Sequence, residues 1–392
     1  MRAPFQFETQ PSIADIPAPA WDRLAGRDNP FVSHAFMLAL EQSGCVGGRS
    51  GWHPFHLLCR DETDALVGAV PCYLKTHSQG EYVFDQGWAQ AYERAGGSYY
   101  PKLQVAIPFT PANGPRLLAL DQNVEIKSAL VKGLSALCEQ TNASSVHVTF
   151  PEPDDHALFC EHGWLERHDE QFHWFNDGYQ TYDDFLQNLQ SRKRKAIRKE
   201  REQAQKSGLD IRCLTGDDLT ETHWDAFFTF YMDTGSRKWG RPYLNRTFYS
   251  LIGETMRDRI LLVMAYRDET PVAGAINFIG SDTLYGRHWG AIEHHPFLHF
   301  ELCYHQAIEF AIAHGLKKVE AGAQGQHKLA RGYQPVTTKS AHYIADPDLR
   351  RAVADYLEQE RRHIALVHDE LADHTPFRKI MIEASNPDEW ED

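Results

Sequence analysis

The sequence predicts an α/β protein of two related lobes in tandem, each with a mixed, mostly antiparallel sheet flanked by helices. Three observations lead to this prediction. The chain has 392 residues, 42% of them hydrophobic and 24% charged, which is enough for two domains with separate cores. Apolar runs at strand spacing alternate with runs at helical spacing. The tetrapeptide Arg-Asp-Glu-Thr occurs at 60–63 and again at 267–270, each time between two apolar, strand-like runs.

The first half reads as a polar lead-in followed by an α/β unit. Residues 1–30, the expected polar lead-in, contain five prolines, and 75–115 is expected to form strands and loops. Ser33 is a suitable N-cap for the first helix. The predicted helices are 33–43, 124–140 and 155–162, and the predicted strands are 55–60, 65–74, 145–150 and 171–176.

The second half repeats this order. A strand pair and a third strand precede a helix, a short strand, a further strand and a long charged helix. The predicted strands are 261–267, 272–279, 284–290, 318–321 and 339–344, and the predicted helices are 299–314 and 348–370. We therefore expect one lobe at 1–176 and a second at 177–392, with a basic helical segment at 185–208.

Composition excludes several classes of protein. The formal charge is −14, so a polyanion could bind only at a local basic patch. No apolar run reaches the length of a membrane span, and the first residues do not resemble a secretory signal, so a cytoplasmic location is expected. The seven cysteines are scattered, without a C-x-x-C pair, which argues against a disulfide framework and a zinc ribbon.

The basic segment is SRKRKAIRKEREQAQKSG, at 191–208. It holds eight Lys and Arg residues against two Glu. Two interpretations remain open at this point: a solvated, salt-bridged helix, or a phosphate-binding helix. On the second interpretation, the residues that contact donor phosphate are Arg192, Lys193, Arg194 and Lys195.

The sequence VEAGAQGQHKLARGY, at 319–333, is the main candidate for a site. A β-prone run ends at Glu320, small residues follow, and Lys328 and Arg331 come next. Glu301 or Glu320 could act as a general base toward an amine, with Lys328 and Arg331 binding phosphate or an oxyanion. Each of these residues could instead be a paired structural charge. The residues expected to bind substrate are Tyr100, Lys102, Trp239, Tyr243, Arg287 and Trp289.

The sequence lacks several motifs that are typical of nucleotide-binding proteins, hydrolases and zinc proteases. The sequence has no P-loop, no G-x-G-x-x-G after a strand, no G-x-S-x-G and no H-E-x-x-H. The histidines around EHHPFLHFELCYHQ do not supply three converging ligands, so no metal site is predicted.

Long runs of the chain resemble the FemAB-like bacterial proteins of the GNAT acyltransferase superfamily. These runs are PFLHFELCYHQAIEFAIAHGLKKVEAGAQGQHKLARGYQPV, GEYVFDQGWAQAYERAGGSYYPKLQVAIPFTP and SRKRKAIRKERE. The resemblance implies two GNAT-like lobes and transfer of an acyl or aminoacyl group to an amine, such as that of a cell-wall precursor. It also implies a donor that is not tightly bound.

The donor and the activity stay open between alternatives. The loop [QR]-x-x-G-x-[GA], with which ordinary GNAT enzymes hold coenzyme A, does not match GAQGQHKLARGY. The donor is therefore either aminoacyl-tRNA, with tRNA bound by the basic helix, or acyl-CoA. The alternative activities are an acetyl-CoA-dependent N-acetyltransferase and a non-catalytic peptidoglycan-precursor recognition protein.

Overall fold

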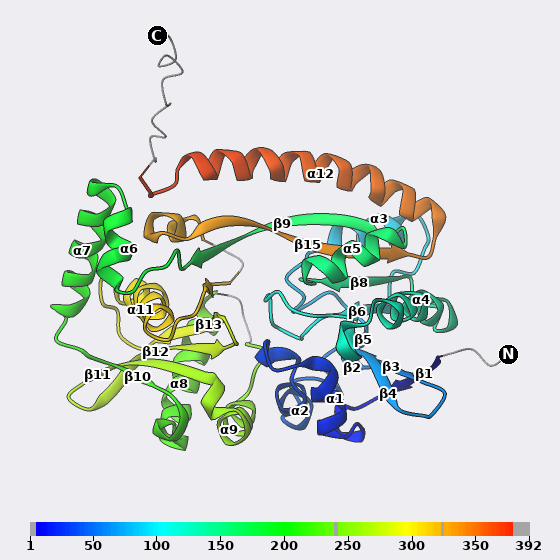
Figure 1. The fold of residues 1–392 in the computed structure, drawn as a ribbon, viewed down its shortest axis with the longest axis horizontal. Helices are drawn as coiled ribbons and strands as arrows, with labels where there is room; N and C mark the ends of the chain where they lie inside the picture. The colour runs from blue at the N-terminus through cyan, green and yellow to red at the C-terminus, as the bar shows by residue number, and fades with distance from the viewer. Residues whose placement is uncertain (1–4, 239–241, 323–324, 379–392) are drawn as a thin grey trace, which may run out of the picture.

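A computed structural model describes residues 5–238, 242–322 and 325–378 of the chain (Figure 1). Its centre is one long mixed sheet, and a smaller antiparallel sheet lies at the N-terminal end. Helices cover both faces, and the long helix α12 runs over the middle strands of the large sheet. Within the described part of the chain, no helix is both long and apolar enough to span a bilayer.

The first half supplies nine strands and five α-helices. They are β1 Gln6–Gln10, α1 Ala18–Ala25, α2 His34–Gln42, β2 Trp52–Pro54, β3 His56–Arg60, β4 Leu66–Val70, β5 Cys72–Lys75, α3 Gln86–Arg94, β6 Lys102–Val105, β7 Leu118–Ala119, α4 Val124–Gln140, β8 Ser145–Thr149, α5 Pro153–Glu161 and β9 Leu165–Phe175.

The second half begins with the basic segment. Its elements are α6 Tyr182–Asn188, α7 Ser191–Gln205, β10 Asp210–Leu214, α8 Glu221–Lys238, α9 Arg246–Thr255, β11 Ile260–Arg267, β12 Thr270–Ile279, β13 Thr283–Ala291, α10 Leu298–Phe300, the π-helical turn η6 Glu301–His305, α11 Gln306–Ala313, β14 Lys318–Glu320, β15 Gln334–Ile344 and α12 Pro347–Asp373. Short 3₁₀ turns connect elements at η1 Ile13–Asp15, η2 Pro30–Val32, η3 Leu120–Gln122, η4 Gly216–Asp218, η5 Arg257–Arg259 and η7 Gln326–Arg331.

Each half contains one parallel strand pair joined through a helix. In the first half β6 pairs with β8 and α4 connects them, and in the second half β13 pairs with β14 through α10–α11. Both pairings are short, since β13 meets β14 only from Thr283 to Tyr285. This repeated unit is what the duplicated sequence pattern predicts.

The two halves exchange their last strands. The large sheet has the order β10-β11-β12-β13-β14-β9-β15-β8-β6-β5-β2. Thus β9, from the first half, pairs with β14 of the second, and β15, from the second half, pairs with β8 of the first. The two exchanged strands also pair with each other along 334–342 of β15. The lobes therefore share one continuous ladder of hydrogen bonds.

The sequence predictions are confirmed where periodicity is strong. Helix α4 has the predicted bounds, and Ser33 caps α2 by accepting a hydrogen bond from the Phe36 backbone N–H. The lead-in prediction for 1–30 was wrong, because β1 adds to β3, and α1 begins after Pro17 and buries Trp21 and Leu24. The prediction for 75–115 also missed a helix, α3, which buries Trp88 and Ala89. The proposed boundary between residues 176 and 177 stays a prediction.

Candidate active site

The second lobe opens where β13 and β14 part. The parallel pairing ends at Tyr285 and Glu320, after which β13 continues beside β12 only. The extension of β13 carries Arg287 and Trp289, and the chain leaving β14 turns toward η7. Side chains from three elements thus converge at the end of a short strand, and Glu320 lies at the fork.

Glu320 is a buried carboxylate with one oxygen unpaired. Its side chain is only 2% exposed, and Lys318 Nζ lies 2.7 Å from Oε1. Oε2 has no hydrogen-bond partner among the described residues. Because buried polar atoms nearly always have partners, this oxygen is positioned to accept a hydrogen bond or a proton from a bound ligand.

His173 lies directly across the ladder from Glu320. It is buried on β9, and its Nε2 is 3.3 Å from Gln171 Oε1. Burial lowers the pKa of His173 to about 4; the Glu320 carboxylate opposes this shift, while Lys318 and Lys328 add to it. The imidazole is therefore neutral at pH 7 and can share a hydrogen bond without carrying charge.

Two cationic side chains come from η7. Lys328 is buried and donates from Nζ to the Gly322 carbonyl at 2.8 Å, and burial lowers the pKa of Lys328 to about 8. An ammonium group has three donors, and among the described residues only this one of the three has a hydrogen-bond partner. Arg331 stacks over the Phe300 ring at 3.4 Å and pairs with Glu200 of α7. Lys328 is thus more available to a ligand than Arg331, whose guanidinium already pairs with Glu200 and stacks on Phe300.

Aromatic side chains of β13, α10, η6 and η7 form a cluster, which we call the aromatic wall: Trp289, His299, Phe300, Tyr304 and His327. Phe300 and Tyr304 are stacked, and the other neighbouring rings lie edge-on or tilted, with the Trp289 and His299 centroids 5.0 Å apart. Tyr304 Oη is 2.9 Å from His327 Nε2, which ties the helix to the loop. Tyr304 comes from the π-helical turn η6, a rare conformation that often occurs at functional sites.

Glu301 faces the basic helix instead of the fork. Both of its oxygens bind the Arg201 guanidinium, at 2.8 and 3.0 Å, and Arg201 also binds Glu309. Together with the Glu200–Arg331 pair, this contact attaches the inner side of α7 to the helix and loop of the candidate site.

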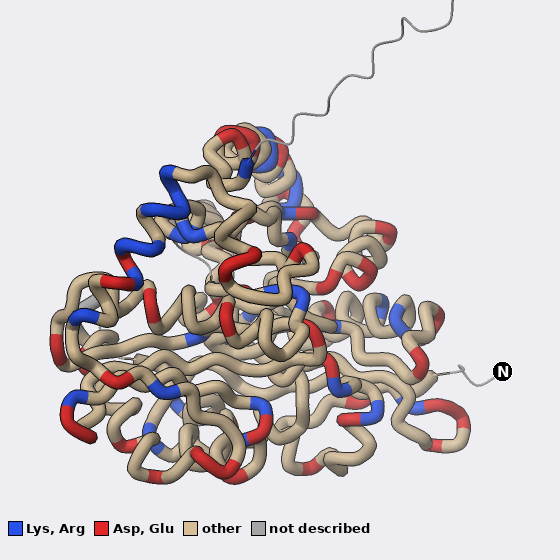
Figure 2. The backbone as a smooth tube through the Cα atoms, turned by 60° about the vertical axis from the view of Figure 1, so that its left-hand side comes forward, with Lys and Arg blue, Asp and Glu red and all other residues tan. Residues whose placement is uncertain are grey.

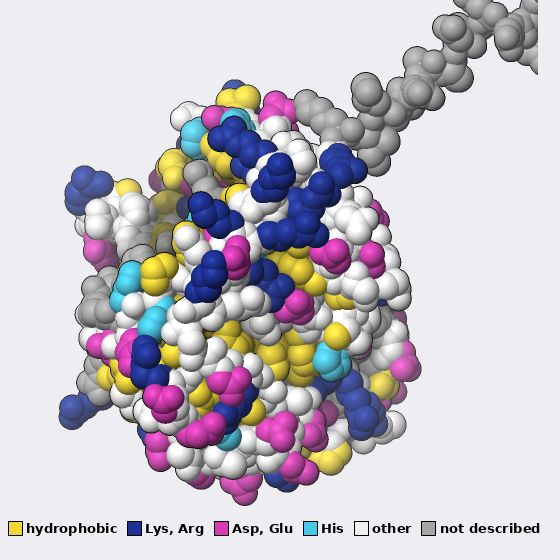
Figure 3. Space-filling view, turned by 90° about the vertical axis from the view of Figure 1, so that its left-hand side faces the viewer, with side chains coloured by type: hydrophobic (Ala, Val, Ile, Leu, Met, Phe, Trp, Pro, Cys, Tyr) yellow, Lys and Arg dark blue, Asp and Glu magenta, His cyan; other side chains and the backbone are white. Residues whose placement is uncertain are grey.

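The outer side of α7 is cationic. Figure 2 shows the Lys and Arg positions along this helix, and dark-blue side chains gather at the top of the face in Figure 3, where α7 lies. Arg192 and Lys195 are exposed, and Lys193 and Arg194 are half-buried. The segment therefore has a salt-bridged inner side and an exposed outer side that is mostly basic, where Arg198 and Lys206 pair with Asp183 and Glu202; phosphate binding by this side stays a prediction.

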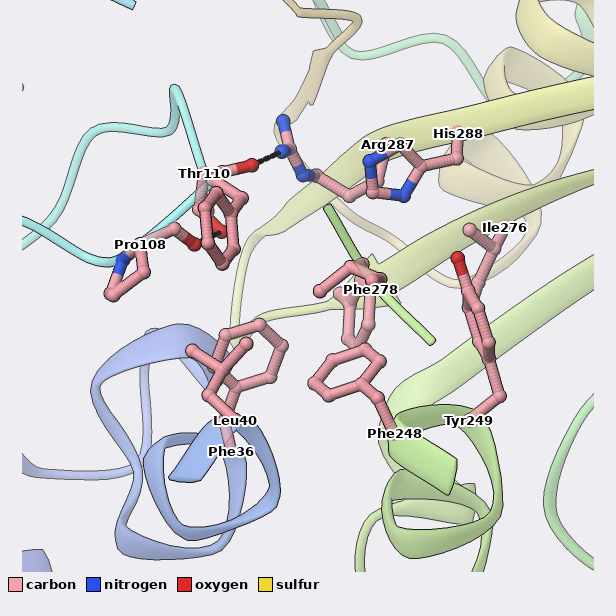
Figure 4. Close-up of a pocket in the computed structure, with 12 residues that line it drawn as sticks. Phe36, Leu40, Pro108, Thr110, Phe248, Tyr249, Ile276, Phe278, Arg287 and His288 are labelled. Atoms are coloured by element: carbon pink, nitrogen blue, oxygen red, sulfur yellow. Dashed lines mark hydrogen bonds between the residues drawn. The ribbon is translucent and has the colours of Figure 1, made fainter. Parts of the chain in front are cut away.

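The remaining predicted residues lie at the junction of the lobes. Arg287 donates to the Phe109 carbonyl at 2.5 Å, and the Tyr243 ring stacks on Phe109 at 4.7 Å. The cavity beside Arg287 is enclosed by aromatic and aliphatic side chains of both lobes (Figure 4). Its volume of about 10 Å³ is close to that of a single water, so it is a packing gap and not a substrate pocket.

Tyr100 and Lys102 form a separate group in the first lobe. Tyr100 Oη is 2.8 Å from Ser78 Oγ. Lys102 is fully buried, 2.7 Å from Glu81 Oε2 and also paired with Asp85. Trp239 lies outside the described residues.

The structure thus brings together some of the predicted site residues and separates others. Glu320 lies at the fork, Lys328 binds the chain that leaves β14, and Trp289 lies farther along β13 against His299, whereas Glu301 and Arg331 bind α7. The sequence predictions missed several polar residues that pair with groups of the candidate site. A signal existed for two of them, because Gln171 and His173 alternate with apolar residues at the end of β9. The missed residues are Gln171, His173, Glu200 and Arg201, whereas His327 belongs to the candidate stretch 319–333.

Comparison with known proteins supports this picture of the fold. A family model described as FemAB-like, peptidoglycan biosynthesis/recognition, matches residues 12–379. The crystal structure of FemX superposes with a TM-score of 0.54 at 10% identity, covering 89% of this chain and 100% of that one.

A second similar structure is the C-terminal domain of a putative lysylphosphatidylglycerol synthetase from Agrobacterium fabrum. It has a TM-score of 0.53 at 9% identity and covers 89% of this chain and 97% of that one. No curated protein matches the sequence. With the repeated strand-helix-strand unit, these matches confirm the predicted α/β fold class with mixed sheets, a fold that the chain shares with FemX.

Proposed function

Because the chain belongs to the FemAB-like family of peptidoglycan biosynthesis and recognition proteins, we propose that it transfers an acyl or aminoacyl group to an amine acceptor. The observation that supports this most directly is the unpaired, buried Oε2 of Glu320 at the fork of β13 and β14. The name of the Agrobacterium neighbour, a putative lysylphosphatidylglycerol synthetase, agrees with aminoacyl chemistry on this fold.

The proposed reaction needs a base and a group that stabilises negative charge. Glu320 takes a proton from the acceptor ammonium, and the resulting amine attacks the donor carbonyl carbon. The new C–N bond creates a tetrahedral oxyanion, which the Lys328 ammonium stabilises. The oxyanion then re-forms the carbonyl as the C–O bond to tRNA or the C–S bond to coenzyme A breaks, the attacking nitrogen loses its extra proton to the leaving oxygen or sulfur, and Glu320 returns its proton to solvent. His173 is a positioning residue beside Glu320.

The basic helix favours aminoacyl-tRNA as the donor. Exposed Lys and Arg on the outer side of α7 would contact phosphates, and the inner side connects directly to the candidate site through Glu301 and Arg331. The acceptor would be an amine of a cell-wall precursor or a small amine. The aromatic wall offers apolar surface for the part of the acceptor that carries the amine.

A direct test follows the mass of candidate acceptors incubated with aminoacyl-tRNA or with acyl-CoA. Wild-type protein should add one acyl or aminoacyl mass, and Glu320→Gln should slow the addition by about 10²- to 10⁴-fold, the usual contribution of a general base. Glu358→Gln, on the exposed side of α12, is the matched control and should react at the wild-type rate.

Three results would redirect the proposal. Equal rates for wild type and Glu320→Gln would remove Glu320 from the reaction. Addition from acetyl-CoA alone, with thermal stabilisation by coenzyme A, would indicate an N-acetyltransferase. Binding of a peptidoglycan precursor without any mass gain would indicate a recognition protein.

A further inference from the structure

A cluster of metal-ligating side chains lies in the first lobe, away from the fork. His156 and Cys160 are four residues apart on α5, so they share one helix face. Glu166 and His168 are two residues apart on β9 and share one strand face. The four side chains thus come from two rigid elements that follow each other in the chain.

The ligand atoms are close to the spacing that a metal requires. The Cys160 Sγ atom is 3.7 Å from His156 Nε2, and His156 Nε2 is 4.0 Å from Glu166 Oε1. His168 Nε2 approaches the same Glu166 oxygen at 2.5 Å. In a tetrahedral zinc site the ligand atoms stand about 3.4 to 3.6 Å apart, because Zn–N and Zn–S bonds are about 2.1 and 2.3 Å long. Ligand atoms of His156, Cys160 and Glu166 all lie within 4.8 Å of one another, and the His168 ring would have to move away from the Glu166 oxygen to join them.

We propose that His156, Cys160, Glu166 and His168 bind one transition-metal ion of the zinc type. A thiolate and imidazoles favour zinc or cobalt over magnesium or calcium, which prefer oxygen ligands. The backbone of Ser340 hydrogen-bonds the His156 ring, the kind of outer contact that orients a metal-bound histidine. The ion would fasten α5 to β9, the strand that crosses into the second lobe.

Two cationic side chains face this cluster: Arg361, which donates to the Glu166 backbone carbonyl, and Lys339. Lys339, across the ladder from His168, places Nζ 2.8 Å from Glu166 Oε1. Metal binding would displace this lysine into solvent, where its side chain already is 42% exposed, and would release the Cys160 thiol proton. Removal of the lysine should therefore favour the metal.

Cobalt(II) titration of the full-length protein tests the proposal. We expect one cobalt per chain, with visible d–d bands and a thiolate-to-cobalt charge-transfer band in the near ultraviolet. Zinc should displace the cobalt and abolish both. Cys160→Ser should lose the charge-transfer band, whereas Cys213→Ser, at an exposed cysteine outside the cluster, should keep it.

Lys339→Ala adds a variant that keeps every ligand. Since an exposed ion pair contributes at most about 1 kcal/mol, its loss should tighten cobalt binding by up to about fivefold. Absence of cobalt bands at excess metal in both wild type and Lys339→Ala would overturn the proposal. So would a charge-transfer band that survives in Cys160→Ser. Circular dichroism of each variant separates loss of ligand from loss of fold.

Discussion

The ion pair between Arg201 and Glu301 should be a large single contribution to stability, and Arg201→Ala tests this. Arg201 makes two hydrogen bonds to Glu301 and two to Glu309, all between 2.7 and 3.0 Å. Glu301 is only 1% exposed, so the substitution leaves a buried carboxylate with Gln306 as its remaining partner. Breaking a buried pair costs about 3 to 5 kcal/mol. We expect about 3 kcal/mol, because the Arg201 side chain is 14% exposed and water can partly replace it.

Urea unfolding at pH 7 measures this change in the free energy of unfolding. Arg198→Ala is the matched control on the same helix, since its pair with Asp183 is about half exposed on both sides. The control should lose less than about 1 kcal/mol. The double variant Arg201→Met, Glu301→Leu should recover most of the loss, since it removes both charges from the interior. Equal losses for Arg201→Ala and Arg198→Ala would refute the reasoning.

Three further predictions follow from buried groups. The pKa of His173 is about 4 in the folded protein and 6.5 when unfolded, so only the unfolded state takes up this proton between those values. The free energy of unfolding should therefore fall as pH drops from 6.5 to about 4, and less steeply in His173→Asn. Transfer should slow as pH rises through about 8, where Lys328 loses its charge, and Lys328→Arg should move this decline to higher pH; identical alkaline profiles would contradict the assigned role. Gly290→Ala should cost about 2 to 3 kcal/mol, because its Cβ would lie 2.2 Å from the Phe230 carbonyl oxygen, whereas Gly87→Ala on α3 meets open space and should be neutral or stabilising in thermal unfolding.

Local patterns predicted some elements, such as α4, but missed the helices α1, α3, α8 and α9. Long-range pairing accounts for the missed start of β9. The stripe of Ile126, Leu130 and Leu134 identifies α4 because helical spacing depends only on near neighbours. The first half of β9, by contrast, is LERHDE, and it extends because β15 pairs with it, a contact that no local pattern contains. A sequence-based prediction therefore started this strand at residue 171 instead of Leu165.

The candidate site shows the same division. A carboxylate at the end of a predicted strand was enough to single out Glu320. The partner of Glu301 could not be predicted, because Arg201 lies 100 residues earlier in the chain and nothing in either segment specifies the other. The run of basic residues at 191–208 is evident in the sequence, but the packing of α7 decides which of them face the interior of the protein.

The exchange of β9 and β15 has a consequence for how the molecule can move and be divided. A cut near residue 176 would yield two fragments. The first would hold β9, which pairs with β14 of the second, and the second would hold β15, which pairs with β8 of the first. Neither fragment should be a good folding unit by itself, yet mixed together they carry all the pairs needed to reassemble. The same interlock opposes a hinge between the lobes, since opening one would break the β9–β15 ladder. Access to the fork must then come from rearrangement of surface segments around a rigid double lobe.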